Sequence, residues 1–355
     1  MTPILSNNYF VNFKEDAYIK LNIYISENKP SAIFILVDEN TNNYCLPLLM
    51  EKLETKAEIE IIEIEAGEVN KNLDTCSGVW NALTELGADR KSLMINLGGG
   101  VITDLGGFVA STFKRGIAFV NIPTTLLSMV DASVGGKTGV DLGVLKNQIG
   151  LFSDPEMVLI DPRYLETISD RELRSGLAEI IKYGITYDIK LWNEICDFKE
   201  LTISNISNLI HRSIEIKNEV VTKDPKEKGL RKILNFGHTL GHAIESYFLE
   251  SEDKENLTHG EAIAIGMVTE AFISQKLLHF PSEHLKTIKK IILEIYGKAE
   301  IDVLDYEGII ELLIHDKKNV SGQVNFVLLA DFEQFKLDCV VEKEILIDGL
   351  NYYNA

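Results

Sequence analysis

Two histidine-containing stretches have the residue types and spacing of a metal site. The 355-residue chain has seven histidines, and His238, His242 and His259 lie close together in the sequence. His238 and His242 are four residues apart, so on a helix their side chains share one face. With the carboxylate of Glu179, these side chains offer nitrogen and oxygen ligands for one divalent ion. Three protein ligands with an open fourth position are typical of catalytic zinc, although an isolated histidine pair is more often structural.

A glycine-rich segment upstream has the composition of a nucleotide site. Residues 98–107 read GGGVITDLGG and follow an apolar run. Glycines at the start of a helix let the backbone approach a pyrophosphate, and the helix N–H groups then face the anion. Asp38 ends an earlier apolar run, where it could bind ribose hydroxyls, and Thr124 and Thr125 end another. The segment is not GxGxxG and no Walker A motif occurs, so a ligand-free turn stays open and a dinucleotide is favoured over a triphosphate.

Basic residues recur beside these motifs although the chain is acidic. It has 54 acidic and 35 basic residues and a net charge of −19, which makes nucleic acid and anionic membranes poor partners. The basic residues beside the glycine and histidine motifs are Arg115, Lys137, Lys146, Lys182, Lys217 and Arg231. Each alone is typical of a solvated surface. Their grouping predicts a pocket that binds the phosphate and carboxylate of a small anionic substrate.

The elements that position these residues differ between the two parts of the chain. Strand patterns at 31–37, 58–65, 93–97 and 117–122 alternate with helical segments, which indicates βαβ units and a largely parallel sheet. From about Ser169 the patterns are helical, at 171–183, 201–222, 240–249, 262–278 and 282–296, with one convincing late strand at 324–329. The sequence therefore predicts an α/β domain over residues 1–168 and a mainly helical domain over 169–355.

The composition also bears on location. No apolar run approaches the roughly 20 residues that span a bilayer, and the first residues lack a basic region followed by an apolar core. Cys45, Cys76, Cys196 and Cys339 form no CxxC pair, which favours reduced thiols. We therefore expect a cytoplasmic protein with no membrane partner.

Five longer motifs resemble one enzyme family. They are GGGVITDLGGF, PTTLLSMVDASVGGKTGVD, SGLAEIIKYG, LNFGHTLGHAIE and HGEAIAIGM, and their order and spacing from about Asp38 to Leu329 resemble the 3-dehydroquinate synthases. The resemblance implies an α/β N-terminal Rossmann-like domain followed by a mainly α-helical C-terminal domain. It implies NAD, one Zn²⁺ or Co²⁺ ion and a homodimer. The implied reaction converts 3-deoxy-D-arabino-heptulosonate 7-phosphate to 3-dehydroquinate and phosphate by transient oxidation, phosphate elimination, re-reduction and an intramolecular aldol step.

The resemblance also implies a role for individual residues. The metal ligands would be Glu179, His238 and His259, whereas His242 would contact substrate, which differs from the pairing that spacing alone suggests. The NAD-binding residues would be Asp38, Glu68, Lys71, Gly99, Gly100, Val101, Asp104, Thr124, Thr125, Lys137, Lys146 and Thr167. The catalytic and substrate-binding residues would be Arg115, Asp131, Lys137, Lys146, Asn147, Lys182, Lys217, Arg231, Asn235, His242 and Lys317.

Three other functions are compatible with parts of this pattern. The first is a related cyclase that makes an inosose or a valiolone. The carboxylated substrate is favoured instead by the match at Arg231, Asn235, His238 and His242. The second is a metal-dependent polyol dehydrogenase, which would need no group of lysines for a phosphate. The third is a non-catalytic binding protein, and the presence of every matched metal and NAD position argues against it.

Overall fold

The computed structural model describes residues 1–143, 145–197, 203–313 and 324–355. By packing, the chain divides into two compact units, one of Met1–Ser169 with Thr202–Thr222 and one of Asp170–Leu201 with Lys223–Ala355. The sequence-based division assigns residues 202–222 to the second domain, but this helix packs on the first unit. The rings of His211 and Phe13 are tilted by 44° with centroids 4.9 Å apart, and Asn218 donates to the Leu5 carbonyl at 2.8 Å.

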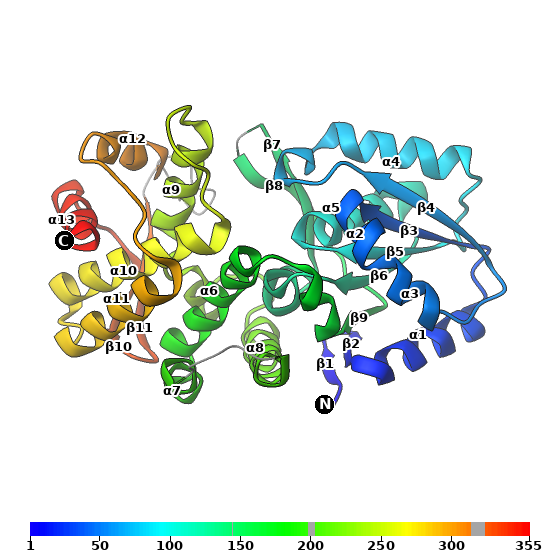
Figure 1. Ribbon diagram of the computed structural model, residues 1–355, viewed down its shortest axis with the longest axis horizontal. Helices are drawn as coiled ribbons and strands as arrows, with labels where there is room; N and C mark the ends of the chain where they lie inside the picture. The colour runs from blue at the N-terminus through cyan, green and yellow to red at the C-terminus, as the bar shows by residue number, and fades with distance from the viewer. Residues whose placement is uncertain (144, 198–202, 314–323) are drawn as a thin grey trace. The chain divides into compact units, whose positions relative to one another are not determined.

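Among the described residues of the first unit, seven strands form one sheet (Figure 1). Their spatial order is β1 (Ile4–Ser6), β2 (Tyr9–Phe13), β9 (Met157–Ile160), β6 (Ala118–Pro123), β5 (Leu93–Gly98), β3 (Ala32–Asp38) and β4 (Glu58–Ile64). Every neighbouring pair is parallel except β1 with β2. The four predicted strands are confirmed as β3, β4, β5 and β6, whereas β1, β2 and β9 were not predicted.

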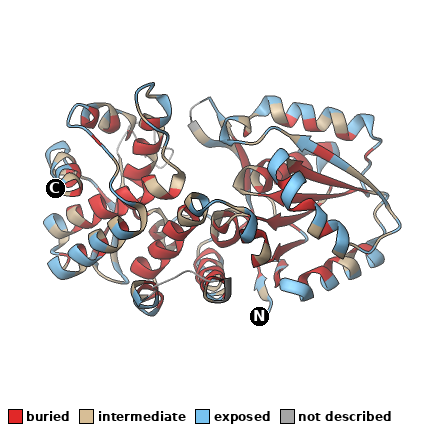
Figure 2. Cartoon of the chain, viewed as in Figure 1, coloured by how far each residue is buried: buried red, intermediate tan, exposed pale blue. Residues whose placement is uncertain are grey.

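Helices and a hairpin complete the first unit. The helices are α1 (Lys14–Asn28), α2 (Glu39–Tyr44), α3 (Leu46–Lys52), α4 (Leu73–Glu85), α5 (Gly100–Thr112) and α8 (Ile203–Lys223). Short helical turns are η1 (Glu68–Asn70), η2 (Phe113–Arg115), η3 (Ser128–Ala132) and η4 (Pro162–Thr167), and β7 (Lys137–Leu142) pairs with β8 (Leu145–Phe152). A core packs Phe34 and Met94 of the sheet against Val79 of α4 and Leu105 of α5. The central strands of the sheet are coloured as buried in Figure 2.

The strand order fixes where this sheet can bind a ligand. β3 has β4 on one side and β5 on the other, and β6 and β9 continue beyond β5. The order therefore reverses between β3 and β5, and a crevice forms outside the carboxyl ends of strands at such a reversal. Asp38 ends β3 and Gly98 ends β5, so the predicted nucleotide residues lie at this edge.

The second unit is mainly helical, as predicted. Its helices are α6 (Asp170–Thr186), α7 (Ile189–Asp197), α9 (His238–Glu250), α10 (His259–Leu278), α11 (Ser282–Tyr296), α12 (Asp305–Leu312) and α13 (Lys343–Asn354), with a short turn η5 (Leu230–Asn235). The predicted late strand is confirmed as β10 (Phe326–Asp331), which pairs with an unpredicted strand, β11 (Gln334–Cys339). Over the described ranges, no helix has the length and apolar character needed to cross a membrane.

Glycines let three helices of this unit cross at close range. A Cβ atom added at Gly260 of α10 would lie 2.1 Å from the Ser175 carbonyl oxygen of α6. A Cβ atom added at Gly266 of α10 would lie 2.0 Å from the carbonyl oxygen of Gly237, which precedes α9. Only glycine fits at such contacts, so α10 lies directly against both α6 and the start of α9.

Candidate functional site

His238 and His259 are each the first residue of a helix, α9 and α10 respectively. The start of α10 is fixed by its own sequence, because Thr258 accepts from the Glu261 N–H at 3.3 Å and Glu261 accepts from the Thr258 N–H at 2.7 Å. This reciprocal pair is a capping box, which satisfies two backbone donors of the first turn. Arg171 of α6 also donates to both Glu261 carboxylate oxygens, at 2.9 and 2.8 Å.

The start of α9 is fixed by a residue of another helix. Its N-cap residue is Gly237 and its third residue is Leu240, and neither side chain can accept a hydrogen bond. The carboxylate of Glu270, fully buried on α10, accepts from the Gly237 N–H at 2.7 Å and from the Leu240 N–H at 3.2 Å. One carboxylate from α10 therefore supplies both bonds of a capping box to α9, and it places His238 relative to α10.

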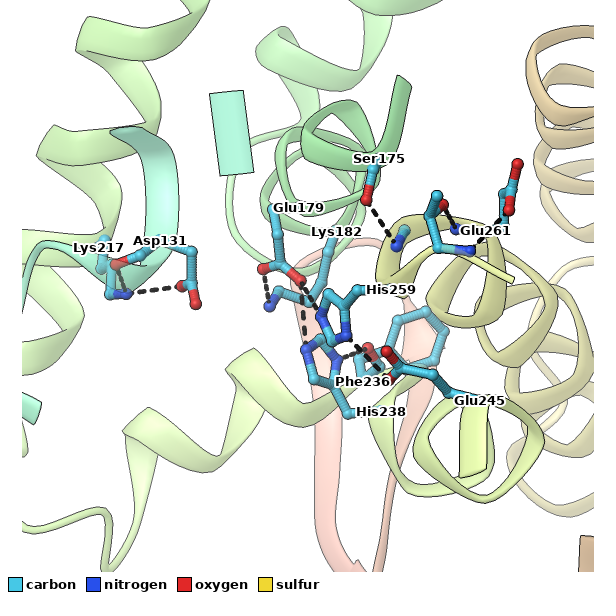
Figure 3. A network of polar contacts seen from close by, with 12 residues as sticks. Asp131, Ser175, Glu179, Lys182, Lys217, Phe236, His238, Glu245, His259 and Glu261 are labelled. Carbon is cyan, nitrogen blue, oxygen red and sulfur yellow. Dashed lines mark hydrogen bonds and ion pairs between the residues drawn. The ribbon is translucent and has the colours of Figure 1, made fainter. Parts of the chain in front are cut away.

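Three of the predicted ligands converge on one point (Figure 3). Glu179 Oε1 lies 3.2 Å from His238 Nε2 and 3.7 Å from His259 Nε2. In a tetrahedral zinc site with bonds of about 2.0–2.1 Å, neighbouring ligand atoms are about 3.3 Å apart. Glu179 Oε1 is buried and accepts no hydrogen bond of good geometry from the described residues. The arrangement of these three side chains therefore fits a small divalent ion.

The other polar atoms of the three ligands have separate partners. His238 Nδ1 lies 3.2 Å from the Phe236 carbonyl oxygen, and His259 Nδ1 lies 3.2 Å from Glu245 Oε2. The Lys182 ammonium donates to Glu179 Oε2. These contacts leave both Nε2 atoms and Glu179 Oε1 to face one another, which is the usual outer arrangement of a metal site. Glu245 and the Phe236 carbonyl were not predicted, although Glu245 follows His238 by seven residues and so shares its helical face.

The charges of the site alter the pKa of two of its residues. Burial alone would raise the pKa of Glu179, but the Lys182 ammonium and the His238 imidazole hold it well below its usual range. Burial opposes charge on His259 as well, yet the Glu245 and Glu179 carboxylates raise its pKa to about 9. Glu179 is therefore anionic at neutral pH, and His259 must lose a proton before its Nε2 binds a metal.

His242 lies beside the same group. Its ring centroid is 5.2 Å from that of His238 and 5.7 Å from that of His259. One ligand atom from each of the three histidines can be chosen so that all three lie within 4.8 Å of one another. The distances from Glu179 Oε1 to the two Nε2 atoms, 3.2 and 3.7 Å, are shorter than this limit of 4.8 Å. The shorter distances favour Glu179 over His242 as the third ligand. The role of His242 as a substrate contact stays a prediction.

Two more predicted residues of the second unit lie in η5. Arg231 is buried and donates to the Pro225 carbonyl at 2.9 Å. Asn235 donates to Glu227 Oε1 at 2.7 Å, and Glu227 was not predicted. η5 ends at Asn235 and α9 begins at His238, so these polar side chains are close in sequence to His238. Lys317 lies outside the described residues.

In the first unit, five predicted residues form one polar group. Lys71 donates to Asp104 Oδ2 at 2.6 Å and to Asn147 Oδ1 at 2.7 Å, and the Lys146 ammonium lies 3.6 Å from Glu68 Oε1. Burial would lower the pKa of Lys71, but Asp104 and Glu68 raise it, and burial raises the pKa of Asp104 against the effect of Lys71. These contacts join η1 and the residue after it to α5 and β8. The residues that make them are the ones predicted to bind NAD and substrate.

The start of α5 has the properties of an anion site. Gly99 is its N-cap, and Gly100 and Val101 are its first two residues. Within the described part of the chain, this end has no side-chain cap, and its first turn has no acidic residue. The N-terminal end of this 13-residue helix favours an anion, because its first N–H groups have no partner within the helix. This end of α5 fits the pyrophosphate of a dinucleotide.

The remaining predicted nucleotide residues have local partners. Asp38 Oδ1 accepts from the Thr41 N–H at 2.8 Å and so caps α2, a role that was not predicted. Thr124 is buried at the end of β6, and Thr125 Oγ1 lies 2.9 Å from Ser128 Oγ. Thr167 donates to a backbone carbonyl of its own turn at 2.7 Å. Asp38 and the two threonines that follow β6 lie at the carboxyl edge of the sheet, whereas Thr167 belongs to η4.

The other predicted substrate residues of the first unit lie in different places. Lys217 of α8 donates to Asp131 Oδ1 of η3 at 2.6 Å. Lys137 is an exposed residue at the start of β7. Arg115 is exposed in η2 with φ of +72°, a left-handed conformation that is uncommon for a residue other than glycine.

Solved structures define the class of protein. A 2-deoxy-scyllo-inosose synthase complexed with carbaglucose-6-phosphate, NAD⁺ and Co²⁺ is 25% identical, with 99% of each chain covered and a TM-score of 0.85. A 2-epi-5-epi-valiolone synthase from Streptomyces hygroscopicus subsp. jinggangensis, with NAD⁺ and Zn²⁺ bound, is 24% identical with a TM-score of 0.87, over 100% of this chain and 99% of the other. The fold is that of the sugar phosphate cyclases.

Sequence relatives define the family. Residues 61–175 match the 3-dehydroquinate synthase N-terminal model, and residues 176–319 match the C-terminal model. A 3-dehydroquinate synthase from Parabacteroides distasonis is 41% identical over 342 residues, which cover 96% of each chain. The chain belongs to the 3-dehydroquinate synthase family.

Proposed function

We propose that the protein is a carbon–oxygen lyase that converts 3-deoxy-D-arabino-heptulosonate 7-phosphate to 3-dehydroquinate and phosphate, a step of the shikimate pathway to aromatic amino acids. One observation carries the proposal. Glu179, His238 and His259 converge at ligand spacing in a chain that is 41% identical to a 3-dehydroquinate synthase over 96% of each sequence. The full-length similarity favours this substrate over those of the inosose and valiolone synthases, which share the fold at 25% and 24% identity.

The two units would bind different cofactors. The end of α5, with the Lys71 and Asp104 group beside it, would hold NAD⁺ in the first unit, and Glu179, His238 and His259 would hold Zn²⁺ or Co²⁺ in the second. When bound, NAD⁺ would accept and later return the hydride of the C5 alcohol, and the metal would polarise that oxygen. Because the hydride returns, the reaction would consume no NAD⁺.

The chain's own charged residues would orient the substrate. Lys182 keeps the Glu179 carboxylate anionic, so the ligand is ready for a cation at neutral pH. Arg231 and Lys217 would hold the substrate carboxylate and hydroxyls, and Lys137, Asn147 and Arg115 would hold the phosphate that leaves, together with Lys317. Holding a flexible substrate through several steps is mainly a matter of orientation, which accounts for the number of polar residues.

A homodimer in the cytoplasm is part of the proposal. All four cysteines are free, which supports a reducing compartment. β1 is an edge strand, and Leu5 and Phe10 of the β1–β2 pair are exposed apolar side chains, which supports burial against a second copy. Light scattering would test the dimer, with an expected mass of about twice 39.8 kDa.

The reaction is tested by product analysis. Purified protein with catalytic NAD⁺ and Zn²⁺ should release phosphate and 3-dehydroquinate in equal amounts, without accumulation of NADH, and a chelator should abolish both. Glu179→Gln should be inactive, whereas Glu294→Gln, an exchange on the exposed face of α11, should match the parent. NADH accumulation on a simple polyol would establish a dehydrogenase. Turnover only of a sugar phosphate without a carboxylate would establish another cyclase.

A further inference from the structure

Glu245 lies behind one of the proposed metal ligands. It belongs to α9, is buried, and its Oε2 lies 3.2 Å from Nδ1 of His259, which belongs to α10 (Figure 3). His238, His242 and Glu245 follow one another at spacings of four and three residues, so α9 presents all three on one face. α9 therefore supplies one proposed ligand directly and contacts a second one, His259, from the side opposite to Glu179.

The two proposed histidine ligands differ in this outer contact. His238 Nδ1 faces the neutral carbonyl oxygen of Phe236, whereas His259 Nδ1 faces the Glu245 carboxylate. An imidazole that donates its Nδ1–H to a carboxylate has a fixed tautomer and ring orientation, and its Nε2 becomes more basic. His259 would therefore be the stronger donor of the pair, with its Nε2 held toward Glu179.

The local charges give Glu245 a second effect. Glu179 is the only carboxylate among the three proposed ligands, and the Lys182 ammonium offsets it. Glu245 places a second carboxylate in contact with one of the ligands that would hold a divalent cation there. Because charges interact strongly in a buried site, this carboxylate favours retention of the cation.

We propose that Glu245 is a positioning residue of the metal centre, which orients His259 through its Nδ1–H and strengthens metal binding without itself being a ligand. The inference rests on the metal site of the proposed function. It adds a residue that acts on affinity and on ligand geometry, with no part in holding the substrate.

Metal affinity tests this role. The Zn²⁺ dissociation constant of the metal-free protein would be measured by competition with a chromophoric chelator, for the parent, Glu245→Gln and Glu245→Ala. Loss of the carboxylate should weaken binding about 10–100-fold in the alanine variant and by less in the glutamine variant, which keeps an acceptor oxygen. Glu250→Gln, on an exposed residue at the end of the same helix, should stay within about twofold of the parent.

A second readout separates positioning from a structural role. In the zinc-loaded parent, ¹⁵N-histidine NMR should show His259 bound to metal through Nε2 and protonated at Nδ1. A metal bond through Nδ1 of His259, or parent-like affinity in folded Glu245→Gln, would overturn the proposal. A lower melting temperature with unchanged affinity would also overturn it, because it would show a structural role alone. If Glu245→Ala does not fold, the glutamine variant decides. A parent that binds no Zn²⁺ would instead refute the metal site itself.

Discussion

The Glu179 carboxylate has a different environment on each oxygen. Oε2 accepts from the Lys182 ammonium, and Oε1 faces His238 and His259. A buried carboxylate is costly without a cation, so Lys182 keeps this side chain ionised before a metal arrives. The metal-free site is therefore already charged and shaped for the ion.

The pKa of His259 predicts how metal binding depends on pH. This pKa is raised to about 9 in the metal-free protein, so His259 is protonated at neutral pH and must release that proton to bind zinc. The apparent Zn²⁺ affinity should therefore fall below pH 9, by about tenfold per pH unit, and level off above it. Chelator competition at several pH values would measure this. A constant affinity between pH 7 and pH 8 would contradict it.

Lys182 should contribute more to the stability of the metal-free protein than to that of the zinc-loaded protein. Lys182→Met removes the cation beside the buried Glu179 carboxylate, and breaking such a pair costs about 3 kcal/mol. We expect this loss in the free energy of unfolding of the metal-free protein, measured by denaturant titration. Saturating Zn²⁺ should reduce the difference from the parent, because the ion supplies a new cation. Lys190→Met, at an exposed residue of α7, is the control, and an equal loss there would contradict the explanation.

At the residue scale, the sequence allowed us to predict side chains that could bind a metal or a substrate directly. It did not allow us to predict residues that act through another residue. The convergence of Glu179, His238 and His259 agrees with the family motifs, although spacing alone had also suggested His242. Glu245 was missed because a glutamate on a helix is usually solvent-exposed, and only the fold shows that His259 lies against it. A backbone carbonyl such as that of Phe236 has no signature in the sequence.

At the scale of elements, long and strongly patterned segments were predictable. β4 alternates isoleucine with glutamate and β3 is continuously apolar, and both were found. β1 and β2 were missed because they are short. β11 has an alternating pattern that could have been recognised.

Helix ends were less predictable than helix centres. The predicted helix 240–249 begins in the structure at His238, because Glu270 supplies the cap that its own sequence lacks. α13 was missed, although its buried residues Leu346, Gly349, Leu350 and Tyr353 have helical spacing.

The crossing of α6 and α10 should not tolerate a side chain at position 260. In Gly260→Ala, the new Cβ would lie 2.1 Å from a backbone oxygen of Ser175, so the two helices must separate, at a cost of about 2–3 kcal/mol. Zn²⁺ affinity should fall as well, because His259 is the adjacent residue. Thermal unfolding and chelator competition would measure both effects.

Gly78→Ala is the matched control for this substitution. Gly78 lies inside α4, and an added Cβ there would meet no atom within 4 Å. Alanine favours a helix more than glycine does, so this variant should be more stable than the parent by about 0.5–1 kcal/mol. Equal destabilisation by both substitutions would show that the close approach at Gly260 is not the cause.

At the scale of the whole molecule, the two units divide the proposed ligands between them. The three proposed metal ligands belong to the second unit, and the residues proposed to bind NAD belong to the first. Hydrogen exchange should show this division, because a ligand stabilises the segments that bind it. Chelation should speed amide exchange in α6, α9 and α10, and NAD⁺ should slow it near η1 and the start of α5. The reverse pattern would contradict the assignment.

The carboxylate of Glu270 has a consequence for the evolution of this chain. Glu270 lies 33 positions downstream of Gly237 and accepts hydrogen bonds from the N–H groups at the start of α9. Positions 237 and 240 therefore need no capping side chain, and they are occupied by a glycine and a leucine. Substitutions at these three positions should therefore be epistatic. A capping side chain at 237 cannot replace the acid, because Gly237 has a φ of +79° and an added Cβ would lie 2.5 Å from Met267 Cγ. A lineage that loses the acid at 270 should therefore lose stability at the start of α9.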